Sequence, residues 1–181
     1  FVWVASIVSR ALFAGCGWYP PPPTPPHVPS GLRVAVAATA DDLVGLLQHA
    51  LEGNEPTVIL EAAAAFEDVG AGAAVPGLGV AVTRREGEGV TVFAVGDAVA
   101  AALAADTEAE VVDLRGLTPL DRGAIAARVK KTGRAVAVGA PDALLAALEG
   151  AFLSLESPLA ALPADASSDR IGAAVRDALT Y

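Results

Sequence analysis

The stretch EVVDLRGLTPLDRGAIAARVKKTGRAVAVG, residues 110–139, decides the fold class of this 181-residue chain. Apolar runs at 110–114 and 135–139 have the length and the β-branched content of buried strands. The polar segment between them, 119–132, is typical of a helix. A strand, a helix and a second strand in this order indicate a parallel β-α-β unit. The stretch therefore predicts an α/β fold.

Residues at both ends of the predicted helix agree with its bounds. Thr118 is a candidate N-cap, and Pro119 suits the first turn because its missing N–H would be unpaired there in any case. Two lysines lie in the last turn, where positive charge is favourable, and Gly133 can supply a left-handed C-cap. We expect these residues, together with Asp121, to have structural rather than catalytic roles.

Strands and helices alternate along most of the chain. Strands are predicted at 32–36, 57–61, 110–114, 135–139 and near 159–162, with two more in 79–96 around a polar turn at 84–89. Helices are predicted between Thr39 and Gly53, with Asp41 and Asp42 in the first turn, and at 97–105, 119–132, 142–155 and 168–179. Apolar side chains of the last two helices are expected to be buried, among them Phe152 and Leu179. This order predicts a three-layer α/β domain with a mostly parallel sheet.

We divide the chain into three parts. Residues 1–30 form an apolar segment and a proline-rich connector, 31–78 form a first, partial α/β unit, and 79–181 form the three-layer domain. Residues 62–79 are rich in alanine and glycine and are expected to form a connecting loop.

The first 18 residues, FVWVASIVSRALFAGCGW, are apolar apart from Arg10. The run is barely long enough to span a bilayer and has a charge in its middle, so we interpret it as a buried strand followed by a helical turn. Export or membrane anchoring is the alternative. Residues 19–30, YPPPPTPPHVPS, are interpreted as a stiff extended connector, although they contain the PxxP spacing that adaptor domains bind.

Composition excludes several classes of function. The formal net charge is −9, which disfavours nucleic acid and anionic membrane surfaces as partners. The single cysteine, Cys16, excludes an intrachain disulfide framework, and two histidines, His27 and His49, make a histidine zinc site improbable. Hydrophobic residues make up 54%, enough for a sizeable core. We therefore expect a cytoplasmic protein with no nucleic-acid or membrane partner and no metal site of its own.

The decisive stretch also resembles a known family. EVVDLRGLTPLDRGAIAARVKKTGRAVAVG is similar to the C-terminal domain of transketolase-like, thiamine-diphosphate-dependent enzymes. Its Val-Lys-Lys-Thr-Gly-Arg run resembles the beta subunit of 2-oxo acid dehydrogenases. HVPSGLRVAV, DDLVGLLQHALEGNEPTVILE and VTRREGEGVTVFAVGDAV resemble successive upstream segments of that subunit. The resemblance extends from residue 27 to about 156 and implies a transketolase C-terminal-like domain preceded by the end of a pyrimidine-binding domain.

The resemblance implies a heteromeric enzyme. In the family, a beta subunit supplies the pyrimidine-binding domain and an alpha-type partner supplies the diphosphate domain, with the cofactor between them. Thiamine diphosphate and Mg²⁺ are therefore expected only through a partner chain, and this chain alone is expected to bind neither. The C-terminal domain of the family mainly builds the dimer, so an oligomer is expected.

Three departures from the family fall at functional positions. The Gly-rich stretch with a His-Ser-Gln run should lie near residues 15–24, where this chain has GCGWYPPPPT and no histidine. After the strand at 135–139 the family has His-Glu and a double glycine, whereas this chain continues as VGAPDALLAALEG. The family's cofactor-activating glutamate has no counterpart before residue 27. The scaffold is kept while functional features are lost.

Few residues remain as candidates for catalysis. His27 matches a histidine of the family, and Glu61 ends a strand, where a catalytic carboxylate could lie. Structural roles are the alternative for both, and His49 is expected at the solvent edge of its helix. Asp113 and Arg115 flank a strand end and are interpreted as a salt bridge or a dimer contact.

Two principal hypotheses follow. The first is a reduced beta-like subunit of a thiamine-diphosphate-dependent 2-oxo acid dehydrogenase or transketolase-type heteromer, which contributes a dimer interface and a pocket wall. The second is a non-catalytic structural or assembly protein descended from that family. An exported protein that only shares the fold is a third possibility.

Overall fold

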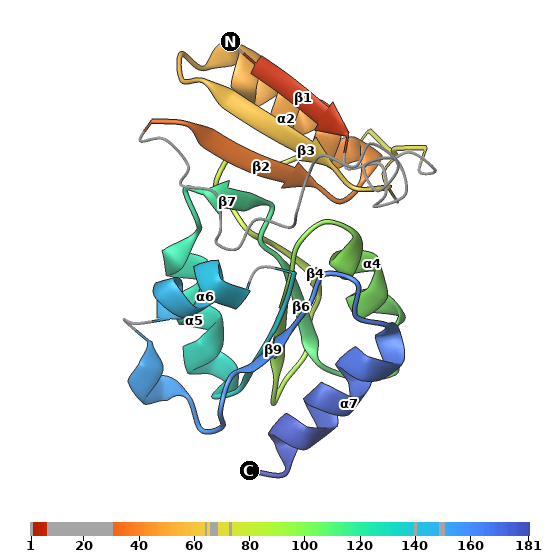
Figure 1. The fold of residues 1–181 in the computed structure, drawn as a ribbon, viewed down its shortest axis with the longest axis vertical. Helices are drawn as coiled ribbons and strands as arrows, with labels where there is room; N and C mark the ends of the chain where they lie inside the picture. The colour runs from red at the N-terminus through yellow and green to blue at the C-terminus, as the bar shows by residue number, and fades with distance from the viewer. Residues whose placement is uncertain are drawn as a thin grey trace, which may run out of the picture.

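The computed structural model describes residues 2–6, 31–63, 65, 69–72, 74–139, 141–148 and 151–181. Expectations for Arg10, Cys16, His27 and the proline-rich connector fall outside these residues. The described chain forms two sheets in two lobes, with the N-terminal elements in the upper lobe of Figure 1 and most of the C-terminal half in the lower one.

The larger sheet has five strands in the order β4-β6-β5-β8-β9. Their bounds are β4 Val82–Arg85, β5 Thr91–Ala94, β6 Glu110–Asp113, β8 Ala135–Val138 and β9 Ala160–Leu162. All neighbouring pairs are parallel except the edge pair of β4 and β6, which is antiparallel. The predicted mostly parallel sheet is therefore confirmed.

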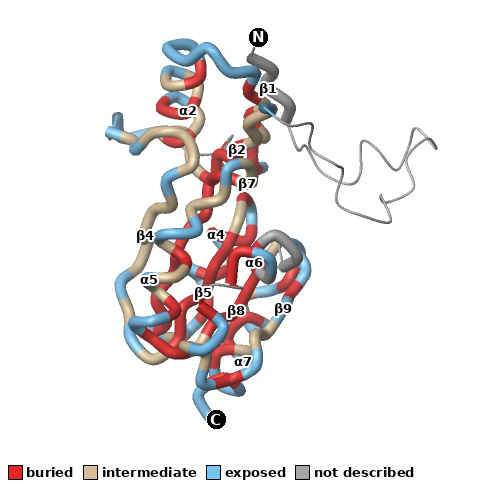
Figure 2. Tube along the Cα trace, turned by 90° about the vertical axis from the view of Figure 1, so that its left-hand side faces the viewer, coloured by how far each residue is buried: buried red, intermediate tan, exposed pale blue. Residues whose placement is uncertain are grey.

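Helices cover both faces of this sheet. Their bounds are α4 Asp97–Ala104, α5 Arg122–Thr132, α6 Pro141–Leu148 and α7 Ser168–Leu179. Helices α4 and α7 pack on one face, and α5 and α6 pack on the other (Figure 1). Between the two helix layers, every residue of β5, β6 and β8 is buried. Figure 2 shows β5 and β8 as buried chain inside the lower lobe. The predicted three-layer architecture is confirmed.

The smaller sheet has four strands in the order β1-β3-β2-β7. Strands β1 (Val2–Ser6), β3 (Thr57–Glu61) and β2 (Arg33–Ala37) are parallel, and β7 (Gly116–Thr118) pairs with β2 in the antiparallel direction. Helix α2 (Ala40–Glu52) connects β2 to β3 and packs its apolar side chains against both. The predicted strand at the N-terminus is present as β1.

Local sequence signals set the ends of α2 as expected. Thr39 is the N-cap: its hydroxyl accepts a hydrogen bond from the Asp42 amide, and the Asp42 carboxylate accepts one from the Thr39 amide. This is a capping box with aspartate in place of the usual glutamate. Gly53 is the C-cap.

The predicted start of helix α5 is wrong. The helix begins at Arg122, and its N-cap is Asp121, whose Oδ1 accepts from the Ala124 amide at 2.9 Å. Thr118 does not cap a helix, because it ends strand β7 and pairs with Val34. Pro119 follows that strand through a cis peptide bond instead of opening the helix. The end is as predicted, with Gly133 in the left-handed conformation at φ 71°.

Three other expectations also need correction. Helix α6 ends at Leu148 rather than continuing to residue 155, and a short 3-10 turn, η1 (Phe152–Ser154), follows. Phe152 and Leu179 are 69% and 53% exposed rather than buried. The polar turn predicted at 84–89 begins later, because Arg84 and Arg85 belong to strand β4.

Candidate functional site

Four charged side chains meet where the two sheets join. Asp42 comes from the first turn of α2, Arg84 from β4, Asp113 from the end of β6 and Arg115 from the link between β6 and β7. Asp42, Asp113 and Arg115 have side chains at most 1% exposed, and Arg84 is 20% exposed. We call these four residues the charge cluster. Buried charges are costly unless they are paired, and here two carboxylates balance two guanidinium groups.

The two arginines share the carboxylates. The Arg84 guanidinium donates to Asp113 Oδ2 from Nη2 at 2.8 Å and from Nε at 3.2 Å, and it also pairs with Asp42 Oδ2. Arg115 Nε lies 2.9 Å from Asp42 Oδ1. Asp42 therefore contacts both arginines while it caps α2.

Arg115 lies in the short link between the two sheets. The chain leaves β6 at Asp113 and enters β7 at Gly116, so only two residues connect the two sheets. Arg115 has φ 50°, a left-handed conformation that is uncommon for any residue other than glycine. Its Nη1 donates to the carbonyls of Pro76 and Val80, both at 3.2 Å, and its amide donates to Asp113 Oδ1 at 3.0 Å. Its Nη2 makes no hydrogen bond with the described residues.

Burial controls the acidity of the cluster. Burial raises the pKa of the Asp113 carboxyl to about 6, although hydrogen bonds and the charge of Arg84 oppose the rise. Burial also lowers the pKa of Arg115, against the attraction of Asp42 and Asp113. For Arg84, burial lowers the pKa, but the hydrogen bonds and charges of Asp113 and Asp42 outweigh it and the pKa is raised. The pKa of Asp113 is thus raised toward neutral pH by the burial of its carboxyl.

A second buried network lies at the other end of β6. Glu110 is fully buried, and its carboxylate accepts from Thr91 Oγ1 at 3.0 Å, Arg128 Nη1 at 3.0 Å and Lys131 Nζ at 2.8 Å. The Glu110 hydrogen bond is the largest cause that raises the pKa of Lys131. All four residues belong to the five-stranded sheet or to α5, so this network is internal to the C-terminal half.

Glu61 lies at the carboxyl ends of the parallel strands, where α/β proteins commonly bind ligands. It is 8% exposed and lies in register with Ser6 of β1 and Ala37 of β2, and its carboxylate forms no hydrogen bond or ion pair with another described residue. The start of α4 faces this edge, because a Cβ added at Gly96 would lie 3.2 Å from Val36. Glu61 is not part of the charge cluster.

The remaining predicted site residues have structural surroundings. The ring of His49 bonds through Nδ1 to the carbonyl of Gly45 at 2.7 Å, one turn earlier on α2. Asp121 also accepts from the Ala81 amide through Oδ2, and a Cβ added at Gly133 would lie 2.7 Å from Glu156. Pro119 packs beside Gly79. Within the described ranges, no three His, Cys, Asp or Glu side chains are grouped so that they could hold a metal ion.

Asp113 and Arg115 are the predicted residues that the structure brings together. The Arg115 amide donates to Asp113 Oδ1, while their side chains form ion pairs with Asp42 and Arg84, partners that the sequence analysis missed. Asp42 was recognised only as a first-turn acid, and Arg84 only as part of a polar turn. The contacts from Arg84 to these two carboxylates join residues 42 and 29 positions apart. No local pattern marks such distant pairs.

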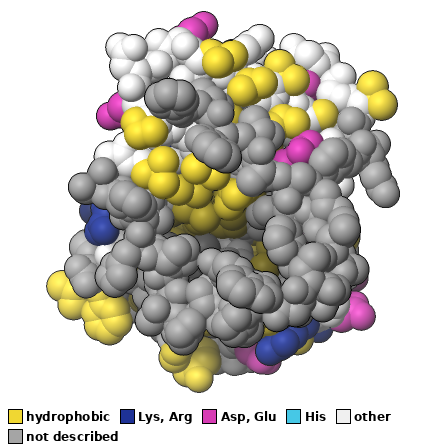
Figure 3. All heavy atoms as spheres, turned by 45° about the horizontal axis from the view of Figure 1, so that its top comes forward, with side chains coloured by type: hydrophobic (Ala, Val, Ile, Leu, Met, Phe, Trp, Pro, Cys, Tyr) yellow, Lys and Arg dark blue, Asp and Glu magenta, His cyan; other side chains and the backbone are white. Residues whose placement is uncertain are grey.

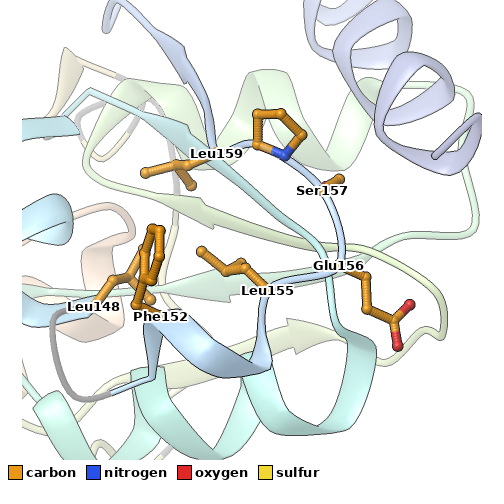
Figure 4. A pocket seen from close by; sticks show the side chains of 7 residues that line it. Leu148, Phe152, Leu155, Glu156, Ser157 and Leu159 are labelled. Atoms are coloured by element: carbon orange, nitrogen blue, oxygen red, sulfur yellow. The ribbon is translucent and has the colours of Figure 1, made fainter.

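An apolar pocket of about 860 Å³ opens between the end of α6, η1 and the start of β9. Figure 4 shows Leu148, Phe152, Leu155 and Leu159 gathered on one side, with the Glu156 carboxylate turned away from them. Leu153, next to the pocket residue Phe152, is 99% exposed.

Apolar side chains of described residues are also visible on the side of the molecule drawn in Figure 3. In Figure 3 the described side chains on this side are mostly hydrophobic, and acidic and basic ones lie mainly near the margin. No helix within the described ranges is long and apolar enough to cross a membrane.

Comparison with known proteins identifies a domain. Residues 79–158 match the model of the transketolase C-terminal domain. The chain is 35% identical to the beta subunit of 3-methyl-2-oxobutanoate dehydrogenase from Mycobacterium tuberculosis, over 72% of this chain and 43% of that protein. It is 34% identical to the beta subunit of pyruvate dehydrogenase E1 from Bacillus subtilis, over 71% of this chain and 46% of that protein.

Two further comparisons extend this picture. The beta subunit of acetoin:2,6-dichlorophenolindophenol oxidoreductase from Bacillus subtilis is 34% identical over 81% of this chain and 43% of its own length. A solved structure described as a split gene transketolase, inactive beta4 tetramer, has the same fold, with a TM-score of 0.67 at 23% identity over 83% of this chain and 58% of that chain. The chain spans less than half the length of these curated relatives.

Proposed function

The chain carries a transketolase C-terminal domain and resembles the beta subunits of 2-oxo acid dehydrogenases, and from this premise we propose that it acts as a beta-like subunit of a thiamine-diphosphate-dependent heteromer. The observation that carries the proposal is the similarity to such beta subunits over 71 to 81% of this chain. Its role is to build a subunit interface and one wall of a shared pocket. The reaction class is 2-oxo acid decarboxylation with acyl transfer, or transfer of a two-carbon unit.

The wall is assigned to the carboxyl ends of β2 and β3. Ligands of open α/β sheets bind outside this edge. Glu61 offers a buried carboxylate there without a described hydrogen-bond partner, and the start of α4 lies against the same edge at Gly96. His27, which matches a histidine of the family, remains a second candidate, and it lies outside the described residues.

The described residues do not fit thiamine diphosphate and Mg²⁺ by themselves. A Mg²⁺-bound diphosphate needs oxygen ligands grouped around the ion, and the part of the chain that the structure describes has no group of three acidic or histidine side chains suited to it. The buried acids of the charge cluster are already paired with arginines. We therefore place the cofactor's diphosphate and metal sites on an alpha-type partner chain, and no catalytic step is assigned to this chain.

The surface of η1 is proposed as the subunit interface. Phe152 and Leu153 project beside the apolar pocket, so a protruding and a hollow apolar surface lie next to each other. A twofold contact needs one patch that is complementary to itself, and this arrangement meets that condition. The similar split gene transketolase is a tetramer by its own description.

A non-catalytic assembly protein is the second candidate. It is favoured by the described titratable side chains, because His49 bonds to backbone and the buried acids Asp42, Glu110 and Asp113 serve structural ion pairs. In this case the fold and the interface are kept without a cofactor.

Native mass spectrometry of the protein purified from its own source, in the presence of thiamine diphosphate and Mg²⁺, separates the two candidates. A heteromer that retains the cofactor is the expected result. Substitution of Glu61 by Gln in this heteromer should then weaken cofactor retention, whereas the matched change of Glu110 to Gln should not. A homo-oligomer or monomer without cofactor would leave the assembly protein as the function.

A further inference from the structure

The two lobes have separate apolar cores. We call β1, β2, α2 and β3 the first unit, and the five-stranded sheet with its helices and the β7 arm the C-terminal unit. Buried side chains of the first unit, including Leu46 and Ile59, cluster around α2. The two clusters on the faces of the larger sheet contain a single described residue of the β2–α2–β3 segment, Ala38. Apolar packing therefore contributes little to joining the units.

Backbone pairing between the units is short. Strand β2 meets β7 in two register pairs, Val34 with Thr118 and Ala35 with Gly116, and the register shifts between them. One more bond joins the Val36 amide to the Arg115 carbonyl. We call this pairing the seam. The seam has two register pairs, whereas the parallel pairing of β2 with β3 has five.

The charge cluster lies across the seam. Arg84, Asp113 and Arg115 belong to the C-terminal unit, and Asp42 is the member from the first unit. Asp42 pairs with both arginines, so its removal leaves the buried Arg115 guanidinium and the partly exposed Arg84 guanidinium with one remaining carboxylate. Breaking a buried ion pair from one side is strongly destabilising.

We propose that the first unit opens from the C-terminal unit as one body along the seam, and that the charge cluster is the latch that holds it closed. In the open state β2 leaves β7, Asp42 leaves Arg84 and Arg115, and the segment between β3 and β4 keeps the units connected. The inference concerns the motion of the chain itself and goes beyond the proposed function.

The acidity of Asp113 gives this opening a distinct pH dependence. Three charged groups face its carboxylate: Asp42 from α2, Arg84 from β4 and Arg115 from the β6–β7 link. On the neighbouring α5, Asp121 is engaged with the Ala81 and Ala124 amides instead. The closed state raises the pKa of Asp113 to about 6, and opening lets water reach it and returns the pKa toward its ordinary value of 3.8. Opening then releases a proton, so it becomes more favourable as pH rises from about 4 to about 6 and is constant above.

Hydrogen exchange measured by mass spectrometry tests the latch. Amides of α2 and β3 report on the first unit, and amides of β5 and β8 report on the C-terminal unit. After correction for intrinsic exchange rates, Asp42→Asn should raise the opening constant of the whole first unit by about tenfold or more while β5 and β8 stay unchanged. Arg84→Lys, at the partly exposed end of the cluster, should give a smaller rise with the same distribution.

Two controls separate the latch from simpler effects. Thr39→Ala removes the cap of α2 without removing an ion pair, so it should loosen only the first turn of α2. Glu110→Gln removes a buried carboxylate from the other end of β6. It should raise the opening constant of the C-terminal unit, and the difference in opening free energy between the two units should not increase.

The pH series gives the second test. The opening constant of the first unit should rise by about tenfold or more between pH 4 and pH 6.5, and this rise should disappear in Asp113→Asn. Equal opening constants for both units in every variant would overturn the proposal, because the chain would then unfold as one cooperative body. Loss of protection confined to the first turn of α2 in Asp42→Asn would overturn it as well.

Discussion

Asp113 shows most directly what burial does to a single residue of this chain. Its carboxylate is fully buried, pairs with Arg84 and accepts from the Arg115 amide, yet burial outweighs these interactions and raises its pKa to about 6. The folded state therefore holds a proton on Asp113 at pH values where the unfolded chain, with the ordinary pKa of 3.8, has already released it. Stability contributed by this group is greatest below pH 4 and is lost as pH rises to about 6.

Asp113→Asn should remove this pH dependence. The difference in free energy of unfolding between wild type and variant should change in favour of the variant as pH rises from 4 to 6, and it should level off above pH 6. Urea denaturation at a series of pH values measures it. Asn keeps the shape, but its single amide oxygen can replace only one of the two acceptors, either the oxygen that faces Arg84 or the one that faces the Arg115 amide. A difference that stays constant across this range would show that Asp113 is ionised at all these pH values.

The sequence indicated a salt-bridge or dimer-contact role for Asp113 and Arg115 but not the partners of their side chains. Asp113 and Arg115 are two positions apart at a strand end, so their contact is visible in the local pattern. Arg84 and Asp42 reach them only after two sheets have formed and packed. Glu110 was missed for the same reason, since its cationic partners follow 18 and 21 residues later on α5.

At the scale of the elements, the start of α5 depends on Asp121. Its two carboxylate oxygens accept from the Ala124 amide in the helix and from the Ala81 amide before β4. Asp121→Ala should lower the free energy of unfolding by about 1–2 kcal/mol, because a cap and a tertiary hydrogen bond are lost together. Thr118→Ala, at the residue first predicted as the cap, should cost clearly less. Chemical denaturation of both variants decides between the two helix starts.

The end of α5 is constrained in a different way. Gly133 has φ 71°, and a Cβ there would lie 2.7 Å from Glu156 Cδ. Gly133→Ala should therefore lower the free energy of unfolding by about 1 kcal/mol or more. Adding Glu156→Ala to this variant should recover the part of the lost free energy that comes from the steric clash. The part that comes from the left-handed backbone conformation should remain. Recovery of the full loss in the double variant would contradict the role of the left-handed conformation.

Elements with complete local signals were predicted well. Strand β3 has the predicted bounds, and α2 has the predicted caps at Thr39 and Gly53. Strand β7 was missed because three residues after a strand carry no periodicity, and only pairing with β2 makes them a strand. The end of α6 was placed too late because its apolar spacing continues through Phe152, whereas the chain turns after Leu148.

The molecule consists of a C-terminal unit with helices on both faces of its sheet and a smaller first unit joined to it along the seam. Figure 2 shows buried residues continuing through the middle of the larger sheet, while the parts around α2 carry more exposed chain. The net charge of −9 disfavours association through long-range attraction between copies. Self-association, where it occurs, then depends on apolar contact, and the surface of η1 offers exposed Phe152 and Leu153 next to a pocket.

Sedimentation velocity tests this surface at the scale of the assembly. Phe152→Ser with Leu153→Ser should shift the protein to smaller species, because both side chains are largely exposed in the single chain and their apolar area is removed from the contact. Stability of the folded chain should change by less than about 0.5 kcal/mol per substitution, since neither residue belongs to the core. Val44→Ser is the matched control, because Val44 is 56% exposed on α2, away from η1. An equal shift in the control would assign the association to general surface hydrophobicity, and an unchanged assembly in the double variant would remove η1 from the interface.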